Sequence, residues 1–168
     1  MSTVFLIGFM TAGKTKTGKQ LAKLLKRPFI DLDRVIEEKE KKSISEIFCE
    51  RGENDFRKLE ADTLLALDLS LNAVVATGGG TPCFHDNMNW MNENGISVWL
   101  QISVDAVMKR IAESKKPRPL LANLQGDELK KFVKAKMTER EKFYSQAHIQ
   151  LSTEGVSLQH LKELIEEK

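Results

Sequence analysis

Residues 8–15 read GFMTAGKT, and their types and spacing indicate a chemical role more clearly than any other part of the sequence. They match the pattern G-x-x-x-x-G-K-[ST], with the apolar run VFLI before them and a segment of helical spacing after them. In such a loop, backbone N–H groups cradle phosphate oxygens, and the positive end of the next helix faces the same anion. The sequence therefore predicts a site for ATP or GTP. The alternative is a strand-to-helix turn with an incidental Lys-Thr.

Two side chains of this loop have specific predicted roles. Lys14 is expected to reach the β- and γ-phosphates, and the hydroxyl of Thr15 is expected to ligate Mg²⁺. The other residues of the loop and of the start of the helix that we expect at the nucleotide are Gly8, Thr11, Ala12, Gly13 and Lys16.

Asp31 and Asp33 form a second candidate group, at the end of a predicted strand that begins at Phe29. Because side chains alternate along a strand, we expect the two carboxylates to point to opposite faces. One would then face Mg²⁺ and the other a second substrate. The alternative is that Asp33 caps the next helix beside a solvated carboxylate.

Three consecutive glycines, residues 78–80, follow the apolar run AVVA. One or two glycines would suffice for a turn, whereas three present bare backbone N–H groups and let a ligand come very close. A flexible connection is the alternative.

Three arginines are candidates for binding anions. Arg57 lies one helical turn from Glu60, which would orient its guanidinium to bind a carboxylate, unless the two form only a surface ion pair. Arg140 lies on an otherwise apolar helical stripe, where a cation needs an anionic partner. Arg118 lies in the proline-flanked stretch SKKPRPLL, which predicts a lid that stabilises charge during group transfer.

Predicted strands alternate with predicted helices along the chain. We expect strands at residues 3–7, 29–33, 73–76, 97–100 and 148–151. We expect helices at residues 14–26, 43–52, 54–70, 86–93, 103–113 and 127–146, with others starting at Val35 and Ser157, and we expect Gly95 to terminate the helix at 86–93. This order, without a linker-like change in composition, predicts one doubly wound α/β domain with a mainly parallel sheet.

The composition is typical of a soluble globular protein, since 41% of the 168 residues are hydrophobic and 30% are charged. No apolar run approaches the roughly 18 residues that span a bilayer, and the first strand starts too early for a signal peptide, so we expect a cytoplasmic protein. The net charge of +2 is spread out, which argues against nucleic-acid binding. The two cysteines are too few and too far apart to predict a disulfide framework or a zinc site.

Taken together, the motifs resemble those of shikimate kinase. The similarity runs through GFMTAGKT, DLDRVIE, ISEIFCERGENDFRKLE, VVATGGG, VWL, RPLL and ERxxFYxxA, and so covers nearly the whole chain. ISEIF with FRKLE and TGGG is more specific than the phosphate loop alone. The resemblance implies a three-layer P-loop kinase fold with a central, mainly parallel five-stranded sheet flanked by helices. It also implies a single domain over residues 1–168, with a substrate-binding region near residues 33–60 and a lid near residues 112–124.

The activity implied by the resemblance is transfer of the γ-phosphoryl group of ATP to the 3-hydroxyl of shikimate, on the route to chorismate and the aromatic amino acids. Mg²⁺ is the implied cofactor, and shikimate and ATP are the implied partners, with no nucleic acid or membrane. A monomer is the simplest expectation for this family.

The resemblance also implies roles for residues at the shikimate site. Asp33 would hydrogen-bond the accepting hydroxyl and is the candidate base, while Asp31 would support Mg²⁺ through water. Arg57 and Arg140 would grip the carboxylate of shikimate, with Glu60 positioning Arg57. The remaining contacts to shikimate would come from Phe48, Phe56, Gly79 and Gly80.

On the nucleotide side, Arg118 would meet the phosphates from the lid and act in catalysis with Lys14, and Arg110 would pack on adenine. Two positions depart from the family pattern. Thr11 stands where the family usually has glycine, and Lys16 stands where it usually has Thr or Ser. Because Lys14 and Thr15 are kept, we expect activity to survive these changes.

Two alternatives stay open on the sequence. A related kinase for gluconate or a nucleoside monophosphate would share the phosphate loop and the lid, but would have no reason for FRKLE and GGG in these places. A nucleotide-binding module with reduced activity has only Thr11 and Lys16 in its favour.

Overall fold

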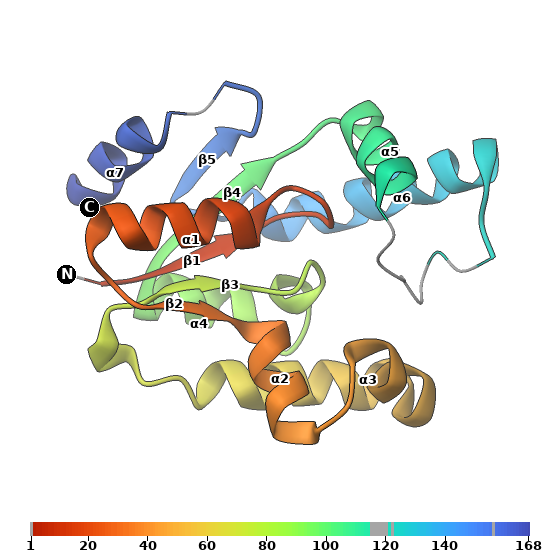
Figure 1. The fold of residues 1–168 in the computed structure, drawn as a ribbon, viewed down its shortest axis with the longest axis horizontal. Helices are drawn as coiled ribbons and strands as arrows, with labels where there is room; N and C mark the ends of the chain where they lie inside the picture. Colours follow the sequence, from red (N-terminus) through yellow and green to blue (C-terminus); the bar gives the residue numbers. More distant parts are fainter. Residues whose placement is uncertain (1, 115–120, 122, 156) are drawn as a thin grey trace.

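Five parallel strands form the central sheet of the protein, as the sequence predicted. The computed structural model describes residues 2–114, 121, 123–155 and 157–168. The strands are β1 (Thr3–Ile7), β2 (Phe29–Asp31), β3 (Val74–Ala76), β4 (Gly95–Gln101) and β5 (Ile149–Ser152). Their order across the sheet is β2-β3-β1-β4-β5, and every neighbouring pair is parallel. All five strands therefore end at the same edge of the sheet, on the right in Figure 1.

Seven helices surround this sheet within the described part of the chain (Figure 1). Their bounds are α1 (Lys14–Leu25), α2 (Leu32–Glu40), α3 (Ile44–Leu65), α4 (Asn87–Asn94), α5 (Val104–Glu113), α6 (Gly126–Tyr144) and α7 (Leu158–Glu166). Two short 3-10 helices, η1 (Leu69–Leu71) and η2 (Thr81–Cys83), flank β3 in the sequence. None of the described helices is both long enough and apolar enough to cross a membrane.

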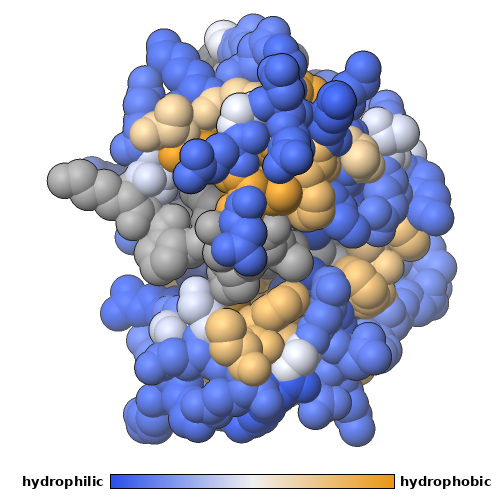
Figure 2. Space-filling model, turned by 90° about the vertical axis from the view of Figure 1, so that its right-hand side faces the viewer, coloured by the Kyte–Doolittle hydropathy of each residue, from blue (hydrophilic) through white to orange (hydrophobic). Residues whose placement is uncertain are grey.

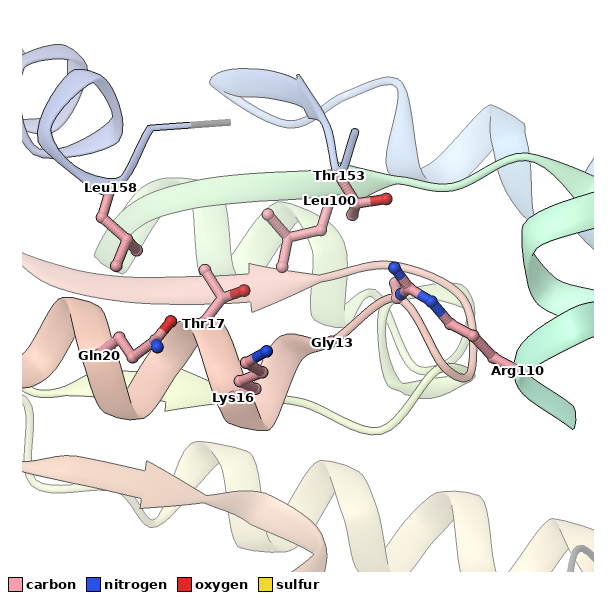
Figure 3. A pocket seen from close by; sticks show the side chains of 9 residues that line it. Gly13, Lys16, Thr17, Gln20, Leu100, Arg110, Thr153 and Leu158 are labelled. Atoms are coloured by element: carbon pink, nitrogen blue, oxygen red, sulfur yellow. The ribbon is translucent and has the colours of Figure 1, made fainter. Parts of the chain in front are cut away.

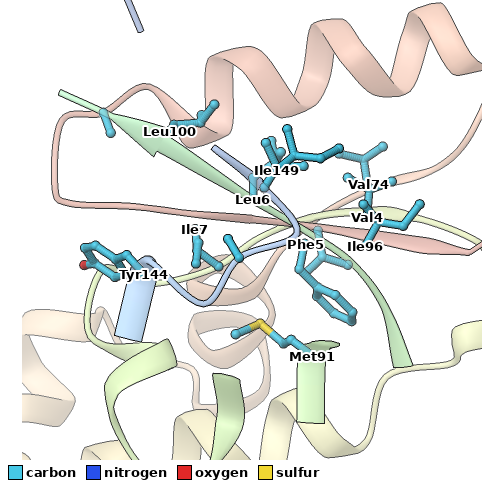
Figure 4. Close-up of a cluster of buried hydrophobic side chains, with 14 of the residues drawn as sticks. Val4, Phe5, Leu6, Ile7, Val74, Met91, Ile96, Leu100, Tyr144 and Ile149 are labelled. Atoms are coloured by element: carbon cyan, nitrogen blue, oxygen red, sulfur yellow. The ribbon is translucent and has the colours of Figure 1, made fainter. Parts of the chain in front are cut away.

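The central strand β1 is buried on both faces, which explains its continuous apolar sequence. Leu6 and Val4 lie on the side of α1, whereas Phe5 and Ile7 lie on the opposite side (Figure 4). On that side the ring of Phe5 meets the ring of Trp90 edge-on, with the centroids 5.9 Å apart. Helices on both faces of the sheet produce the predicted three-layer fold.

A second, smaller hydrophobic cluster joins α2 to α3. Its buried members are Ile36, Ile47 and Phe56. Helix α3 begins with the predicted capping box, in which Ser43 and Glu46 satisfy each other's backbone N–H groups. The interruption predicted at Gly52 is present: its backbone is non-helical (φ 78°, ψ 173°) and divides α3 into two helical segments that meet at a kink.

Two local predictions differ from the structure, and a third is confirmed with an unexpected backbone. Helix α3 ends at Leu65, whereas the sequence predicted a helix to residue 70; the short helix η1 follows. Gly95 terminates α4, as predicted, but its backbone is extended (φ 178°) and it is also the first residue of β4; a Cβ there would collide with the carbonyl oxygen of Thr3 on β1. Ser157 precedes α7, but its side chain makes no capping hydrogen bond.

The loop between β1 and α1 contains a threonine in a strained conformation. Thr11 has φ 64°, in the left-handed region that a β-branched residue rarely adopts. Its carbonyl oxygen accepts a 2.6 Å hydrogen bond from Nη1 of Arg110 on α5. Its buried hydroxyl has no partner among the described residues. Thr11 therefore stands at a position whose backbone suits glycine.

We expect Thr11→Gly to stabilise the protein. Release of left-handed strain contributes about 1–2 kcal/mol, and the greater freedom of glycine in the unfolded chain offsets roughly 0.5–1 kcal/mol of it. The free energy of unfolding, measured by urea denaturation, should rise by about 0.5–1 kcal/mol.

Thr138→Gly is the matched control, because Thr138 lies on ordinary helical backbone in α6. This change should lower the free energy of unfolding, since glycine disfavours the helix interior. If Thr11→Gly were no more stable than the unaltered protein, the strain assigned to Thr11 would be wrong.

Candidate active site

The loop before α1 ends in a cation-rich helix N-terminus. Gly13, with φ 86°, turns the chain into α1, whose first turn contains Lys14, Thr15 and Lys16 and no acidic residue. The ammonium group of Lys14 donates to the carbonyl oxygens of Gly8 and Phe9, at 2.8 and 2.9 Å. Two lysines in this first turn add to the positive end of the helix dipole, which favours a bound anion.

A cavity of about 500 Å³ lies next to this helix terminus. Figure 3 shows the residues that line it, from α1, from β4, from α5 and from the chain after β5. Four of the predicted nucleotide contacts line it, namely Ala12, Gly13, Lys16 and Arg110. Five lining residues were not predicted, namely Thr17, Gln20, Leu100, Thr153 and Leu158. The spacing of Gly13, Thr17 and Gln20 along one helix face could have indicated two of them.

Of the described residues, the other predicted nucleotide contacts lie in the loop or at the start of α1, outside this cavity lining. Gly8 leaves β1 with φ 143°, and Thr11 holds Arg110 through its carbonyl oxygen. Lys14 is hydrogen-bonded to the loop itself. Thr15 points elsewhere: its Oγ1 donates to Oδ2 of Asp31 at 2.8 Å.

The two aspartates lie where β2 ends and α2 begins, whereas the sequence predicted both on the strand. Asp31 ends β2 and caps α2, and Asp33 lies in the first turn of that helix. The prediction that both lie on a strand is therefore wrong, because the Asp31 side chain accepts the backbone N–H of Arg34 and starts the helix early. Two residues along a helix are about 200° apart, so the carboxylates still face different sites. Asp31 lines a groove with Thr15, whereas Asp33 lines a second cavity.

This second cavity, of about 140 Å³, is lined by every residue that was predicted to contact shikimate. They are Asp33, Phe48, Phe56, Arg57, Glu60, Gly79, Gly80 and Arg140. Gly78, the first residue of the glycine triplet expected to approach a ligand, also lines it, whereas Met10 and Ile44 line it and were not predicted. Figure 2 looks onto the face of the molecule at this edge of the sheet, where patches of hydrophobic residues lie among hydrophilic ones.

Arg57 and Glu60 form a buried ion pair, not a surface one. Nη1 of Arg57 lies 2.6 Å from Oε2 of Glu60, with side-chain exposures of 5% and 1%. The second oxygen of Glu60 accepts the hydroxyl of Thr81 at 2.7 Å. Burial by itself lowers the pKa of the Arg57 guanidinium, but Glu60 and Glu53 outweigh it, so the pKa stands above its ordinary value. Arg57 is therefore a permanent cation at the wall of the cavity.

Aromatic rings and bare backbone complete the surroundings of Arg57. Its guanidinium carbon lies 5.3 Å from the ring centroid of Phe56 and 4.7 Å from that of Phe84. A Cβ on Gly80 would collide with the same guanidinium, and one on Gly78 would meet Glu60 at 2.5 Å. The glycine triplet thus allows β3 to end directly against the ion pair.

Arg140 approaches the cavity from α6. Its guanidinium lies over the ring of Phe9, 5.4 Å from the centroid, and a Cβ on Gly79 would lie 3.2 Å from its Nη1. Although Arg140 is only 6% exposed, no carboxylate within the described ranges forms an ion pair with it. A buried cation without a carboxylate partner is stabilised when an anion binds next to it.

Two neutral groups lie beside the arginines. Burial raises the pKa of the Tyr144 phenol, which donates a hydrogen bond to the carbonyl oxygen of Gly79. Burial also raises the pKa of the Cys83 thiol to about 11. Neither group therefore adds a negative charge at neutral pH.

Arg118 and most of the predicted lid near residues 112–124 lie outside the described residues. Of the lid, the structure describes residues 112–114, 121, 123 and 124. Leu121 is buried.

Comparison with known proteins identifies the family of the chain that forms these two cavities. A model of the family described as shikimate kinase matches residues 10–167. The shikimate kinase of Parabacteroides distasonis is 44% identical over 154 residues, which cover 92% of this chain and 89% of the relative.

Solved structures agree with this match. The crystal structure of shikimate kinase from Bacteroides thetaiotaomicron superposes with a TM-score of 0.89 at 40% identity, covering 99% of both chains. Shikimate kinase from Acinetobacter baumannii, solved in complex with shikimate, gives a TM-score of 0.85 at 33% identity, covering 99% of this chain and 92% of that one. The chain therefore belongs to the shikimate kinase family.

Proposed function

We propose that this protein transfers the γ-phosphoryl group of ATP to the 3-hydroxyl of shikimate, giving shikimate 3-phosphate and ADP on the route to the aromatic amino acids. The observation that carries the proposal is the cavity in which two buried arginines and Asp33 meet beside the phosphate loop. A small hydroxy acid suits this cavity, because its carboxylate would pair with the arginines while a hydroxyl meets Asp33.

The nucleotide would bind along α1. Lys14 and the loop N–H groups would hold its β- and γ-phosphates, and the larger cavity would receive the nucleoside. Arg110 would pack on the base, and Lys16 would place a charge where a hydroxyl is usual. Arg118, from a lid near residues 112–124, would meet the phosphates during transfer. Residues near 33–60 would form the acceptor-binding region of a single domain.

We place Mg²⁺ beside Thr15 and Asp31. Their side-chain oxygens are 2.8 Å apart, where the first turn of α1 meets the end of β2. Among the described residues, no three His, Cys, Asp or Glu side chains cluster in a way that could hold a metal. This fits Mg²⁺, which keeps several waters and takes one or two protein oxygens together with substrate phosphates. When bound, the ion would neutralise negative charge on the phosphates.

At the acceptor, Arg57 and Arg140 would hold the carboxylate, which fixes the ring in the cavity. Phe48 and Phe56, whose ring centroids are 5.6 Å apart, would pack on the apolar part of that ring. Asp33 would then orient the 3-hydroxyl towards the γ-phosphate and accept its proton. Most of the catalysis would come from position and charge, as is general for phosphoryl transfer.

We also propose that the enzyme acts as a monomer in the cytoplasm, where ATP is supplied. Both nucleotide and acceptor cavities are lined by residues of one chain, so a second copy is not needed to build the site. Size-exclusion chromatography with light scattering tests the monomer, and cell fractionation tests the location.

An acceptor assay tests the proposed activity. Coupled ADP release, measured with Mg²⁺ and ATP, should appear with shikimate and stay at background with gluconate or a nucleoside monophosphate. Chelation of Mg²⁺ with EDTA should abolish it. Folded protein that binds ATP but releases no ADP with shikimate would favour the nucleotide-binding module instead.

We expect Arg57→Ala and Arg140→Ala each to raise the KM for shikimate by about tenfold or more, because each removes charge-assisted hydrogen bonds to the carboxylate. The KM for ATP should change little. Arg51→Ala is the matched control, since Arg51 lies on α3 as well but pairs with Glu40 at the surface. An equal loss of ATP binding in the cavity variants would contradict the division into two sites.

Asp33→Asn should lower kcat by about 100-fold or more, the usual contribution of a positioned general base. Asparagine has the same shape, so shikimate binding, measured by calorimetry, should persist. If kcat fell by less than about tenfold, proton transfer to Asp33 would not be part of the reaction.

A further inference from the structure

Arg57 is held by two carboxylates of different character. Glu60 is buried and contacts Nη1 at 2.6 Å. Glu53 is 45% exposed, and its Oε1 alone accepts from both Nε and Nη2, at 3.3 and 3.1 Å. Glu53 does not line the acceptor cavity, which Arg57 and Glu60 both do.

Contacts other than Glu53 also orient Arg57. Glu60, itself fixed by Thr81, holds one end of the guanidinium, and the rings of Phe56 and Phe84 lie against it. The backbone of Gly80 closes the remaining approach. What Glu53 adds to this arrangement is mainly a negative charge.

The contact that Glu53 makes uses the edge of Arg57 that suits an incoming carboxylate. The Nε and Nη2 hydrogens form a fork that binds both oxygens of a carboxylate at once. Glu53 fills this fork with a single oxygen and at longer distances than Glu60. Because Glu53 directly follows the kink at Gly52 and is half-exposed, its side chain can leave the fork for solvent.

The charges at the cavity also indicate that Glu53 opposes the binding of an anion. Asp33 and Glu60 balance Arg57 and Arg140 in the lining. Glu53 adds a third carboxylate next to Arg57, so an anionic substrate that reaches Arg57 meets a negative charge already in contact with it. Like charges at such distances repel even near the surface.

We propose that Glu53 competes with the substrate carboxylate for Arg57 and thereby weakens the binding of shikimate. This inference rests on the proposed function. The phosphorylated product is more negative than the substrate, so the same carboxylate, on returning to Arg57, favours product release. Glu53 is thus an affinity-setting residue outside the cavity lining.

Glu53→Gln tests the proposal, because it keeps the shape and removes the charge. The KM and the calorimetric Kd for shikimate should both fall, by about three- to tenfold, the size expected for one partly exposed charge. Glu50→Gln is the matched control: Glu50 lies on α3 and pairs with Lys42, at 2.5 Å, instead of Arg57. It should change both constants less than about twofold.

The methyl ester of shikimate separates competition from a structural effect. The ester has no carboxylate, so its inhibition constant should be the same for Glu53→Gln and the unaltered enzyme. A raised or unchanged KM and Kd for shikimate in Glu53→Gln would overturn the proposal, as would an equal gain for the ester. Absence of shikimate turnover in the unaltered protein would instead overturn the proposed function.

Discussion

The buried ion pair between Arg57 and Glu60 is the constraint on which the acceptor side of the structure depends. Removing two charges from water costs several kcal/mol per ion, so the pair persists only with short contacts and further hydrogen bonds. The 2.6 Å contact and the hydroxyl of Thr81 meet this need. The pair then dictates the sequence of the neighbouring loop, since side chains at positions 78 and 80 would collide with it. The glycine triplet is thus a consequence of close packing and not a flexible connection.

The parallel sheet explains why the acceptor cavity lies beside the phosphate loop. Because β1 and β3 are neighbours and end at the same edge, the loop after β1 meets the glycines after β3. Met10 lines the acceptor cavity, and Gly13, three residues later, lines the nucleotide cavity. One short loop therefore separates the two cavities, so its backbone conformation determines how a phosphoryl donor and a hydroxyl would face each other.

Local structure that depends on neighbouring residues could be predicted from the sequence, whereas contacts between distant segments could not. The capping box at Ser43 and the strand, loop and helix around residues 3–25 follow from local rules. The end of β2 was misplaced because one side-chain hydrogen bond of Asp31 decides where the helix starts. Thr153 and Leu158 line the nucleotide cavity because of where β5 and α7 pack. The residues around Thr153 and Leu158 do not indicate that position, although they do indicate a strand and a helix. The four-residue spacing of Glu53 and Arg57 was a local signal that could have revealed their contact.

The two departures from the family pattern lie in the phosphate loop and in the first turn of α1. Thr11 adopts the left-handed conformation that explains why glycine is usual there, and its carbonyl oxygen binds Arg110. Lys16 lines the cavity from the first turn of α1. Threonine narrows the range of loop conformations relative to glycine, and lysine adds a cation where the helix dipole is already positive. Both changes lie on the nucleotide side of the site, while the acceptor cavity keeps every residue that the family resemblance implied.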